Sequence, residues 1–390
     1  MLAPALTLAA ALIAAPPSGR PPTGPLQREQ PRLYDIRYDV TLNTAIPYGQ
    51  DDPRNPRDPR EQEPRVTFGG TFELADTPIV MPLIYRGTYS RLIPESIRAE
   101  LWTGGRRDPG LVQRFRIDDR YPHHGHLAVL PIVKFRGQVI RWNIGFRTET
   151  YSSRINDQQA ANLAWPREWP DEVADGLRPQ LFIESDDPIF KQTVERVSQG
   201  SLRMVPPYLA AKDLVRYCLN EVQVVGTGLE RGRQGVLHGL QLKGALATAR
   251  DGRGSPMDLV CVCVAMLRAA GIPARPVIGV EEDEDGRNVP VAWAEFFLQG
   301  AGWIPFDPDE MRGNAIRNRD VRQPWPEFGT MDDLNRRIPL AYHFVPARQV
   351  QSPMYAALWG WDPRPSGAPA AEQRISISII SRGRGPGDPR

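Results

Sequence analysis

Three pieces of sequence within residues 254–308 decide the fold of this chain. The first reads Gly-Ser-Pro-Met-Asp-Leu-Val-Cys-Val-Cys-Val-Ala-Met-Leu-Arg-Ala-Ala-Gly-Ile-Pro-Ala-Arg (254–275), the second Val-Ala-Trp-Ala-Glu (291–295) and the third Gly-Trp-Ile-Pro-Phe-Asp-Pro (302–308). The first piece has the length and composition of a helix, whereas the other two lie in strand-like runs. Their order therefore predicts a helix followed by a small sheet.

The helix predicted over residues 257–270 is apolar on nearly every face. Good helix formers fill it, Gly271 follows its last residue and Pro273 stands just beyond, as at the end of many helices. A helix that is apolar all round is stable only when it is buried. We therefore expect it to pack on an antiparallel sheet that includes 275–281, 289–298 and 303–306.

The order of these motifs resembles the transglutaminase-like superfamily, whose catalytic domain is a papain-like α+β fold. The resemblance covers roughly residues 180–310 and rests on Gly-Ile-Pro-Ala-Arg (271–275) and Gly-Trp-x-Pro-x-Asp-Pro (302–308). It implies a fold rather than an activity, because function depends on the site. The residues that fit the family pattern are Asp258, Arg268, Gly271, Ile272, Pro273, Ala274, Arg275, Trp293, Glu295, Gly302, Trp303, Asp307 and Pro308.

The resemblance also implies where a catalytic triad belongs. Family members carry a nucleophilic Cys before the helix, a His before a small residue and Trp, and an Asp that orients the His. The equivalent positions here hold Pro256, Val291 and Asp307. Proline offers no nucleophile, and valine cannot accept a proton. Because loss of a nucleophile or a base costs on the order of a millionfold in rate, we expect no family chemistry from these residues.

Ser255 is the weak candidate for a substitute nucleophile. It precedes Pro256, and Asp258 follows three residues later, so the two polar residues also predict a capping box at the start of the helix. A nucleophilic serine needs a base, and the histidine nearest in sequence is His238, in a predicted Gly-rich loop. A helix cap and a surface histidine are the favoured interpretation, although a Ser255–His238 pair stays open.

The two cysteines on the predicted helix, Cys261 and Cys263, are surrounded by Leu and Val. They lie away from the helix N-terminus, where a positive dipole lowers a thiol pKa. We therefore interpret them as buried apolar thiols. With three cysteines in all, the chain has no disulfide framework pattern.

Composition sets limits on function. With 390 residues the chain is long enough for two domains with cores of their own. The 48 basic and 46 acidic residues nearly balance, so we expect no nucleic-acid partner. No zinc-type spacing occurs, and His123, His124 and His126 lie beside Pro122 and Gly125 in a predicted solvated turn. No metal and no cofactor are expected.

The chain begins with an apolar run from Leu2 to Ala15, followed by a Pro-rich segment up to residue 30. The run is too short to span a membrane and has the character of the hydrophobic part of a signal peptide. We expect residues 1–30 to be a signal peptide and linker. The protein is therefore predicted to be exported to the periplasm or outside the cell.

Alternating apolar and polar residues predict an all-β, sandwich-like domain over 31–155. A connector over 156–180 contains Trp165 and Trp169, whose suggested roles are packing or carbohydrate stacking. The predicted fold class is α+β, with the transglutaminase-like domain over 181–345. Residues 346–390 add a C-terminal strand and a disordered tail. The strands predicted in the β-domain and the tail are 34–42, 66–74, 79–85, 97–102, 111–117, 127–135, 139–148 and 375–379.

Within the transglutaminase-like region, helices are predicted over 188–197 and 207–221. The acidic run from Glu281 to Gly286 ends in Asp-Gly, which is typical of a hairpin. It lacks the alternating ligands of a calcium loop, so a solvated hairpin tip is the favoured interpretation.

These patterns leave three functions to compare. The first is an exported, inactive module that binds protein, peptide or envelope polymer in a cleft containing Trp293, Trp303, Ser255 and Asp258. The second is an active acyl-transfer hydrolase of peptide or amide bonds that uses Ser255. The third is a structural assembly module. An open cleft lined by Trp293 or Trp303 favours binding, a polar group beside Ser255 favours the hydrolase, and a filled cleft favours assembly.

Overall fold

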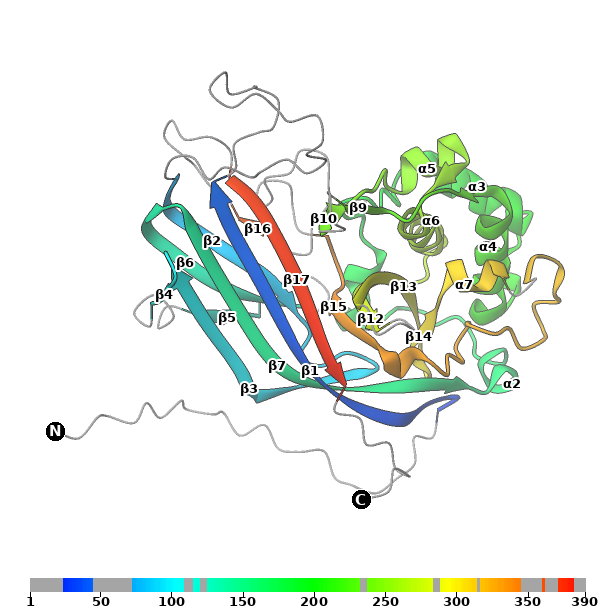
Figure 1. The fold of residues 1–390 in the computed structure, drawn as a ribbon. Helices are drawn as coiled ribbons and strands as arrows, with labels where there is room; N and C mark the ends of the chain where they lie inside the picture. The colour runs from blue at the N-terminus through cyan, green and yellow to red at the C-terminus, as the bar shows by residue number, and fades with distance from the viewer. Residues whose placement is uncertain are drawn as a thin grey trace, which may run out of the picture.

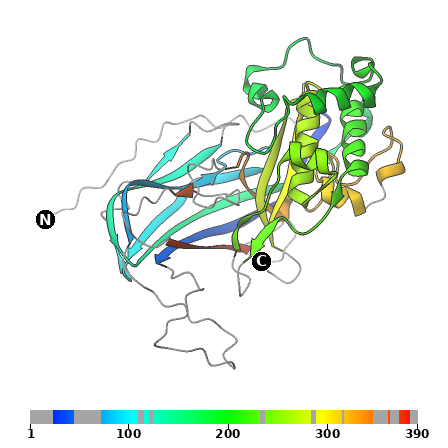
Figure 2. The ribbon, with the colours of Figure 1, turned by 90° about the horizontal axis from the view of Figure 1, so that it is seen from above.

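The computed structural model has a β-rich part and a helical part, and the chain passes between them more than once (Figure 1). Figure 2 shows strands gathered at one end of the molecule and helices at the other. The fold is α+β, with an N-terminal β-sheet region and a core in which one helix packs on a small sheet, as predicted. The structure describes residues 24–44, 72–108, 115–119, 125–231, 237–282, 288–313, 316–344, 360–361 and 371–381.

Two sheets make up the β-rich part. One has seven strands in the order β4-β3-β7-β1-β17-β10-β9, and the other has four in the order β16-β2-β6-β5. Side chains point alternately to the two faces of each strand, so each sheet has one set of side chains facing inward. Buried side chains of both sheets belong to one apolar core. The strands are β1 (Leu26–Thr44), β2 (Phe72–Leu83), β3 (Ser90–Thr103), β4 (Arg106–Arg107), β5 (Arg116–Asp118), β6 (His126–Gly137), β7 (Val139–Ile155), β9 (Leu229–Arg231), β10 (Leu237–Leu240), β16 (Gly360–Trp361) and β17 (Ala371–Ser381).

The strand β1 lies in the middle of the seven-stranded sheet. It pairs antiparallel with β7 on one side and with β17 on the other, and Tyr34 lies opposite both Thr148 and Ser381. Tyr34 and Ile36 are buried, as the alternation predicts. β1 and β17, the first and last described strands of the chain, are therefore neighbours inside the same sheet.

Several strand boundaries differ from the predicted ones. Two runs predicted over 66–74 and 79–85 are one strand, β2, which begins at Phe72, while residues 66–71 lie outside the described part. β1 begins at Leu26, inside the segment predicted as linker. Pairing with neighbouring strands sets these boundaries, and the alternation of residues within one strand does not reveal which neighbours it will have.

The helical part surrounds one helix, α6 (Pro256–Ala269), which Figure 1 shows nearly end-on. Every residue from Met257 to Arg268 is buried, which confirms the predicted all-round burial. Gly271 ends the helix with φ of 74°, a conformation that favours glycine. The helices that pack around α6 include α3 (Pro188–Ser198), α4 (Pro207–Glu221), α5 (Ala245–Asp251) and the short α7 (Pro308–Gly313).

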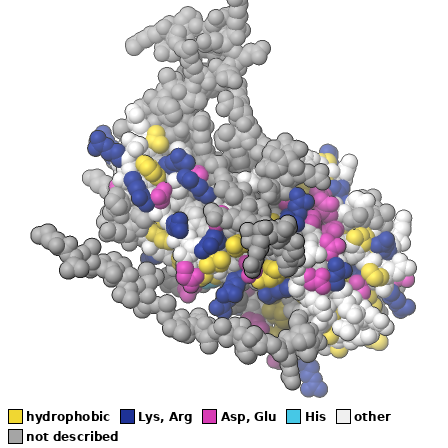
Figure 3. Space-filling model, turned by 60° about the horizontal axis from the view of Figure 1, so that its bottom comes forward, with side chains coloured by type: hydrophobic (Ala, Val, Ile, Leu, Met, Phe, Trp, Pro, Cys, Tyr) yellow, Lys and Arg dark blue, Asp and Glu magenta, His cyan; other side chains and the backbone are white. Residues whose placement is uncertain are grey.

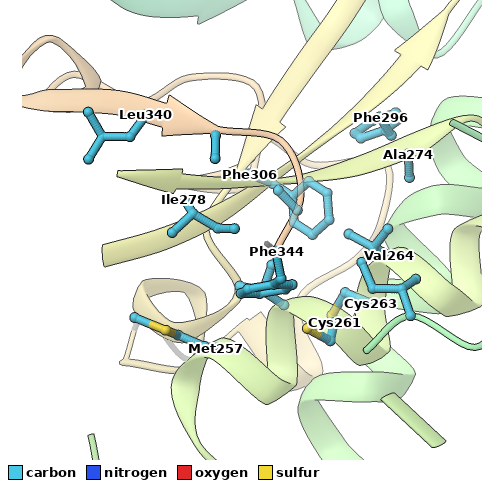
Figure 4. Packing of buried hydrophobic residues seen from close by; sticks show 14 of the residues in the cluster. Met257, Cys261, Cys263, Val264, Ala274, Ile278, Phe296, Phe306, Leu340 and Phe344 are labelled. Atoms are coloured by element: carbon cyan, nitrogen blue, oxygen red, sulfur yellow. The ribbon is translucent and has the colours of Figure 1, made fainter. Parts of the chain in front are cut away.

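A four-stranded antiparallel sheet covers another side of α6. Its order is β14-β13-β12-β15, and it contains the three strands predicted from sequence. Figure 4 shows side chains of this sheet, including Ile278 and Phe306, packed toward Cys261 and Val264 of the helix. The strands are β12 (Ala274–Glu282), β13 (Asn288–Leu298), β14 (Gly302–Phe306) and β15 (Arg337–Ala341).

Among the described residues, no helix combines the length and the apolar character of a membrane span.

Shorter elements connect these layers. The short elements are α2 (Asp157–Ala160), η2 (Asp171–Leu177), η3 (Leu202–Met204), β8 (Gln223–Val224), β11 (Arg253–Gly254), α7 (Pro308–Gly313), η5 (Ile316–Asn318) and η6 (Leu334–Arg336).

The connector is held by its two tryptophans. The Trp165 indole donates to the carbonyl of Val205 at 2.7 Å, and the Trp169 indole donates to the carbonyl of Gly271 at 2.8 Å. The guanidinium of Arg203 lies 4.0 Å from the centre of the Trp165 ring. These contacts support the packing role for the connector, because both indole donors are satisfied within the protein.

A buried ion pair joins the two parts of the molecule. Arg275 of β12 binds Glu295 of β13 at 2.7 Å and donates to the hydroxyl of Thr88, beside β3, at 3.1 Å. The guanidinium lies between the rings of Trp303 and Tyr342, at 4.0 and 3.7 Å from their centres. Burial raises the pKa of Glu295, and Arg275 opposes that shift. The arginine and glutamate of the family pattern therefore fix the helical part to the β-rich part.

Candidate functional site

Ser255 and Asp258 form the capping box that the sequence predicts at the start of α6. The Asp258 carboxylate accepts from the Ser255 amide at 2.9 Å and from its hydroxyl at 2.8 Å. It also accepts from the amides of Lys243 and Gly244, at 2.8 and 3.0 Å. With four donors, this buried carboxylate holds the preceding loop against the helix N-terminus.

The polar group beside Ser255 is therefore the carboxylate of its own capping box. Ser255 is 7% exposed. Gly228 lies against it with φ of 70°, and a Cβ at position 228 would stand 2.9 Å from the Ser255 hydroxyl oxygen. The chain just before β9 thus covers the place where a substrate would have to approach.

Apolar side chains fill the space next to Pro256. Met257 is buried in the same core cluster as Phe344, which follows β15. Figure 4 shows Phe344 beside the first turns of α6, and its ring lies 5.4 Å from that of Phe182. Pro256 itself is partly buried. This side of the helix mouth is packed like a core.

Val291 lies on β13, where it pairs with Gly279 of β12. It packs against a small apolar cluster that includes Trp293 and Met331. Ala292, on the opposite face of the strand, packs against the core that contains α6. Val291 therefore adds to the apolar packing between β13 and the 331–334 segment.

Asp307, at the end of β14, has two structural roles. Its carboxylate accepts from the amides of Asp309 and Glu310, at 2.9 and 3.1 Å, and so caps the short helix α7. It also forms a buried ion pair with Arg337 of β15. The carboxylate of Asp307, predicted from the resemblance to orient a histidine, is therefore bound to an arginine.

Arg337 gathers acidic groups from several segments. Its guanidinium lies 3.2 Å from Glu281 and 3.7 Å from Asp333, besides its contact with Asp307. Burial lowers the pKa of Arg337, but these three carboxylates outweigh burial and raise it above its usual value. The sequence analysis did not identify Arg337, because no local pattern links it with Asp307.

Pro256 begins α6, Val291 lies on β13 and Asp307 follows β14, and their equivalence to a catalytic triad stays a prediction. Trp293 is 2% exposed and belongs to the apolar cluster with Val291. Trp303 is partly exposed, and its ring is stacked on Arg275. Both predicted cleft tryptophans therefore serve packing contacts.

The two cysteines of α6 do not have the lowered pKa that a nucleophilic thiol needs. Cys261 and Cys263 are buried, and burial raises the pKa of each thiol well above its usual value. His238 lies in the strand β10, where a Gly-rich loop was predicted, because β10 pairs with both β9 and β17. His238's side chain lies outside the described part of the structure.

His343 is a buried histidine that the sequence analysis missed. It follows β15 and is 5% exposed. Burial lowers the pKa of its imidazole to about 4, so the ring is neutral at physiological pH. Its neighbour Phe344 packs beside the start of α6, which makes His343 the histidine to compare with Ser255 in any test for activity.

The predicted histidine turn is only partly within the described structure. His126 is the first residue of the strand β6, and its ring contacts Tyr85 edge-on at 4.3 Å between centres. This corrects the expectation that His126 belongs to a solvated loop, while His123 and His124 are outside the described residues. Among the described ranges, no group of three or more His, Cys, Asp or Glu residues is arranged to hold a metal ion.

Comparisons with known proteins agree with this fold. Residues 196–308 match the transglutaminase-like superfamily. A proposed cysteine protease from Cytophaga hutchinsonii has a similar structure, with a TM-score of 0.51 and 12% sequence identity over 92% of this chain and 93% of that chain. At this identity the similarity shows a shared fold.

The periplasmic domain of TgpA from Pseudomonas aeruginosa is less similar, with a TM-score of 0.31 and 15% identity over 73% of this chain and 91% of that chain. No curated protein matches the sequence.

Proposed function

We propose that this chain, whose residues 196–308 are a transglutaminase-like superfamily domain, is a catalytically inactive member of that group and works as an exported assembly or binding module. The observation that carries the proposal is the buried pair between Arg337 and Asp307. A carboxylate held by a permanent cation and by two backbone amides is not available to orient a catalytic base.

The surroundings of α6 support the same proposal. Position 256 holds a proline, the Ser255 hydroxyl is engaged by Asp258, and Gly228 covers it. A nucleophile needs an accessible side chain next to a base, and these contacts instead stabilise the helix N-terminus. The family scaffold thus serves as a rigid core.

Of the two inactive functions, assembly is favoured over binding in the family cleft. Trp293 and Met257 are buried in apolar clusters, as a filled cleft requires. Contacts with a protein, peptide or polymer partner would then come from the outer surface. Figure 3 shows one such face, on which basic and acidic side chains lie beside apolar ones. Such mixed surfaces suit protein partners better than nucleic acid.

The proposal is tested with purified protein and two probes. One is a peptide-amide substrate library, and the other is a fluorophosphonate that labels activated serines. We expect no hydrolysis and no labelling in the parent, in Ser255→Ala or in the matched control Ser198→Ala, whose hydroxyl is exposed at the end of α3. Labelling that is lost in Ser255→Ala or in His343→Ala, but retained in Ser198→Ala, would establish the hydrolase instead.

Export is the second part of the proposal and rests on the apolar run at residues 2–15. Export is measured by fusing residues 1–30 to a phosphatase that is active only outside the cytoplasm. Activity of the fusion, and its loss when Leu6→Arg and Leu8→Arg interrupt the apolar run, is the expected result. An inactive fusion would contradict export.

A further inference from the structure

A cavity of about 590 Å³ lies among the helices α3, α4 and α5, with α6 as its floor. Val262 and Met266 of α6 form part of this floor. Pro256, Val291 and Asp307 are not among the lining residues, so the cavity is separate from the triad-equivalent positions. Its volume falls within the usual range of small-molecule sites.

One wall of the cavity is apolar. Phe190 and Val222 line it together with Ala249, and Phe190 and Val222 are buried. These side chains come from α3, from the end of α4 and from α5. A ligand with an apolar substituent can therefore remove the surface of that substituent from water by packing against these side chains.

The cation at the rim is Arg196, in the last turn of α3. Its guanidinium donates to the Tyr217 hydroxyl and lies 5.4 Å from the centre of that ring. Within the described part of the chain, no carboxylate forms an ion pair with it. By contrast, Arg250, also at the rim, lies 3.5 Å from Asp187. Arg196 is thus the rim cation that can bind a ligand anion.

The anion at the rim is Glu221, the last residue of α4. It lies one turn after Tyr217. Burial raises the pKa of that phenol, and the charge of Glu221 adds to the shift. No ion pair of Glu221 occurs among the described residues, whereas Asp251 at the same rim binds Lys243 at 2.8 Å. One cation and one anion without ionic partners therefore flank the same tyrosine ring.

We infer that this cavity binds a zwitterion with an apolar side chain, namely a free amino acid or short peptide with an unblocked amine and carboxylate. The ligand carboxylate binds Arg196 and the Tyr217 hydroxyl, and the ligand ammonium binds Glu221. The C-terminal end of α4 adds to the attraction for the ammonium. The apolar side chain lies on Met266 and Val262. This inference stands on the cavity alone and does not depend on the proposed function.

The test is a titration of the full-length protein with leucyl-leucine, followed by calorimetry or NMR. Two blocked probes separate the charges, because N-acetyl-leucyl-leucine lacks the ammonium and leucyl-leucinamide lacks the carboxylate. We expect leucyl-leucine to bind at least tenfold more tightly than either blocked probe. Binding should also saturate at one molecule per chain.

Variants locate the site. Arg196→Gln should weaken the binding of leucyl-leucine at least tenfold but leave the binding of leucyl-leucinamide unchanged. Glu221→Gln should also weaken the binding of leucyl-leucine at least tenfold, and it should leave the binding of N-acetyl-leucyl-leucine unchanged. The matched controls Glu195→Gln and Arg216→Gln alter neighbouring residues that do not line the cavity and should change nothing. Ala249→Trp should abolish binding by filling the space while keeping both charges.

Circular dichroism and thermal melting confirm that each variant is folded, and Arg196→Lys, which keeps the charge, should retain part of the affinity. The inference is overturned if leucyl-leucine shows no saturable binding to the folded parent up to about 10 mM, a concentration high enough to detect a millimolar affinity. Equal affinities for blocked and unblocked probes, or no effect of Arg196→Gln and Glu221→Gln, overturn it as well.

Discussion

The guanidinium of Arg337 binds the carboxylate of Asp307, the residue that the sequence resemblance predicts as the acid of a triad. The two residues come from β15 and from the end of β14, which are the outer strands of the four-stranded sheet. The ion pair therefore spans the sheet. A buried carboxylate needs a counter-charge, and Arg337 supplies one to Asp307.

Arg337→Gln is expected to destabilise the protein strongly. Removing one partner of a buried ion pair leaves an uncompensated charge, at a cost of about 3–5 kcal/mol. Urea unfolding followed by tryptophan fluorescence measures the loss. The control is Arg178→Gln, because Arg178 pairs with Asp175 on the surface and should change stability by about 0–1 kcal/mol. Similar small losses in both variants would contradict a structural role for the Arg337 pair.

A rebuilt triad tests whether only side chains separate this site from an active one. Pro256→Cys with Val291→His should react with iodoacetamide little faster than Pro256→Cys alone, because Arg337 holds Asp307. Adding Arg337→Gln frees Asp307 to orient the new histidine, which lowers the thiol pKa and should raise reactivity at pH 6–7. The buried Cys261 and Cys263 should stay unreactive in every variant.

The comparison requires folded variants, which circular dichroism checks before labelling. Equal reactivity in the single, double and triple variants would show that positions 256 and 291 do not meet. The interpretation of Pro256, Val291 and Asp307 as a former triad would then have to be abandoned.

His343 should make stability depend on pH in the acid range. Burial lowers its pKa to about 4 in the folded protein, while an unfolded histidine has a pKa of about 6.5. The unfolded chain therefore binds a proton first as pH falls, so stability is full above pH 6.5 and is lost progressively toward pH 4. The lost amount is about 3 kcal/mol for this site.

His343→Leu removes this titration. The free energy of unfolding, measured in urea at several pH values, should then fall less between pH 6.5 and 4 than in the parent. Parallel curves for parent and variant would show that the imidazole stays accessible to protons in the folded protein.

Glu327 should act in the opposite direction. Burial raises its pKa to about 7, and Asp333, Asp307 and Glu310 add to the shift against Arg337. Between about pH 4.5, where the unfolded side chain titrates, and pH 7 the folded protein holds a proton that the unfolded chain releases. This site therefore makes stability fall as pH rises through that window.

Glu327→Gln cannot release the proton, so its stability relative to the parent should increase from pH 4.5 to pH 7 and then level off. The same urea series measures it, with the exposed Glu168→Gln as control. A variant that gains no stability over the parent on raising the pH would show that the carboxylate is ionised and solvated at neutral pH.

The elements around α6 could be predicted from sequence because their signals are local. Ser255, Asp258 and Gly271 mark the two ends of the helix, and its uniform apolar composition indicates burial. The family pattern then identified β12, β13 and β14. Local rules succeed where caps and periodicity lie within a few residues of each other.

The remaining site residues depend on tertiary contacts that no local pattern encodes. Arg337 meets Glu281, on β12, and Asp307, which follows β14. His343 and Phe344 follow a strand that joins the sheet at its edge, so their burial depends on where β15 pairs. His238 was placed in a loop because Gly and Arg surround it, yet pairing with β17 puts it in a strand.

The pairing of β1 with β17 has a consequence for how this protein matures. The first described strand leaves the ribosome long before its partner at 371–381 has been synthesised. Until then one edge of β1 stays open to other extended chains, and the sheet cannot close around its core. Residues 371–381 must be synthesised before this architecture exists, so a product that stops short of them would expose a ready template for aggregation rather than a smaller folded protein.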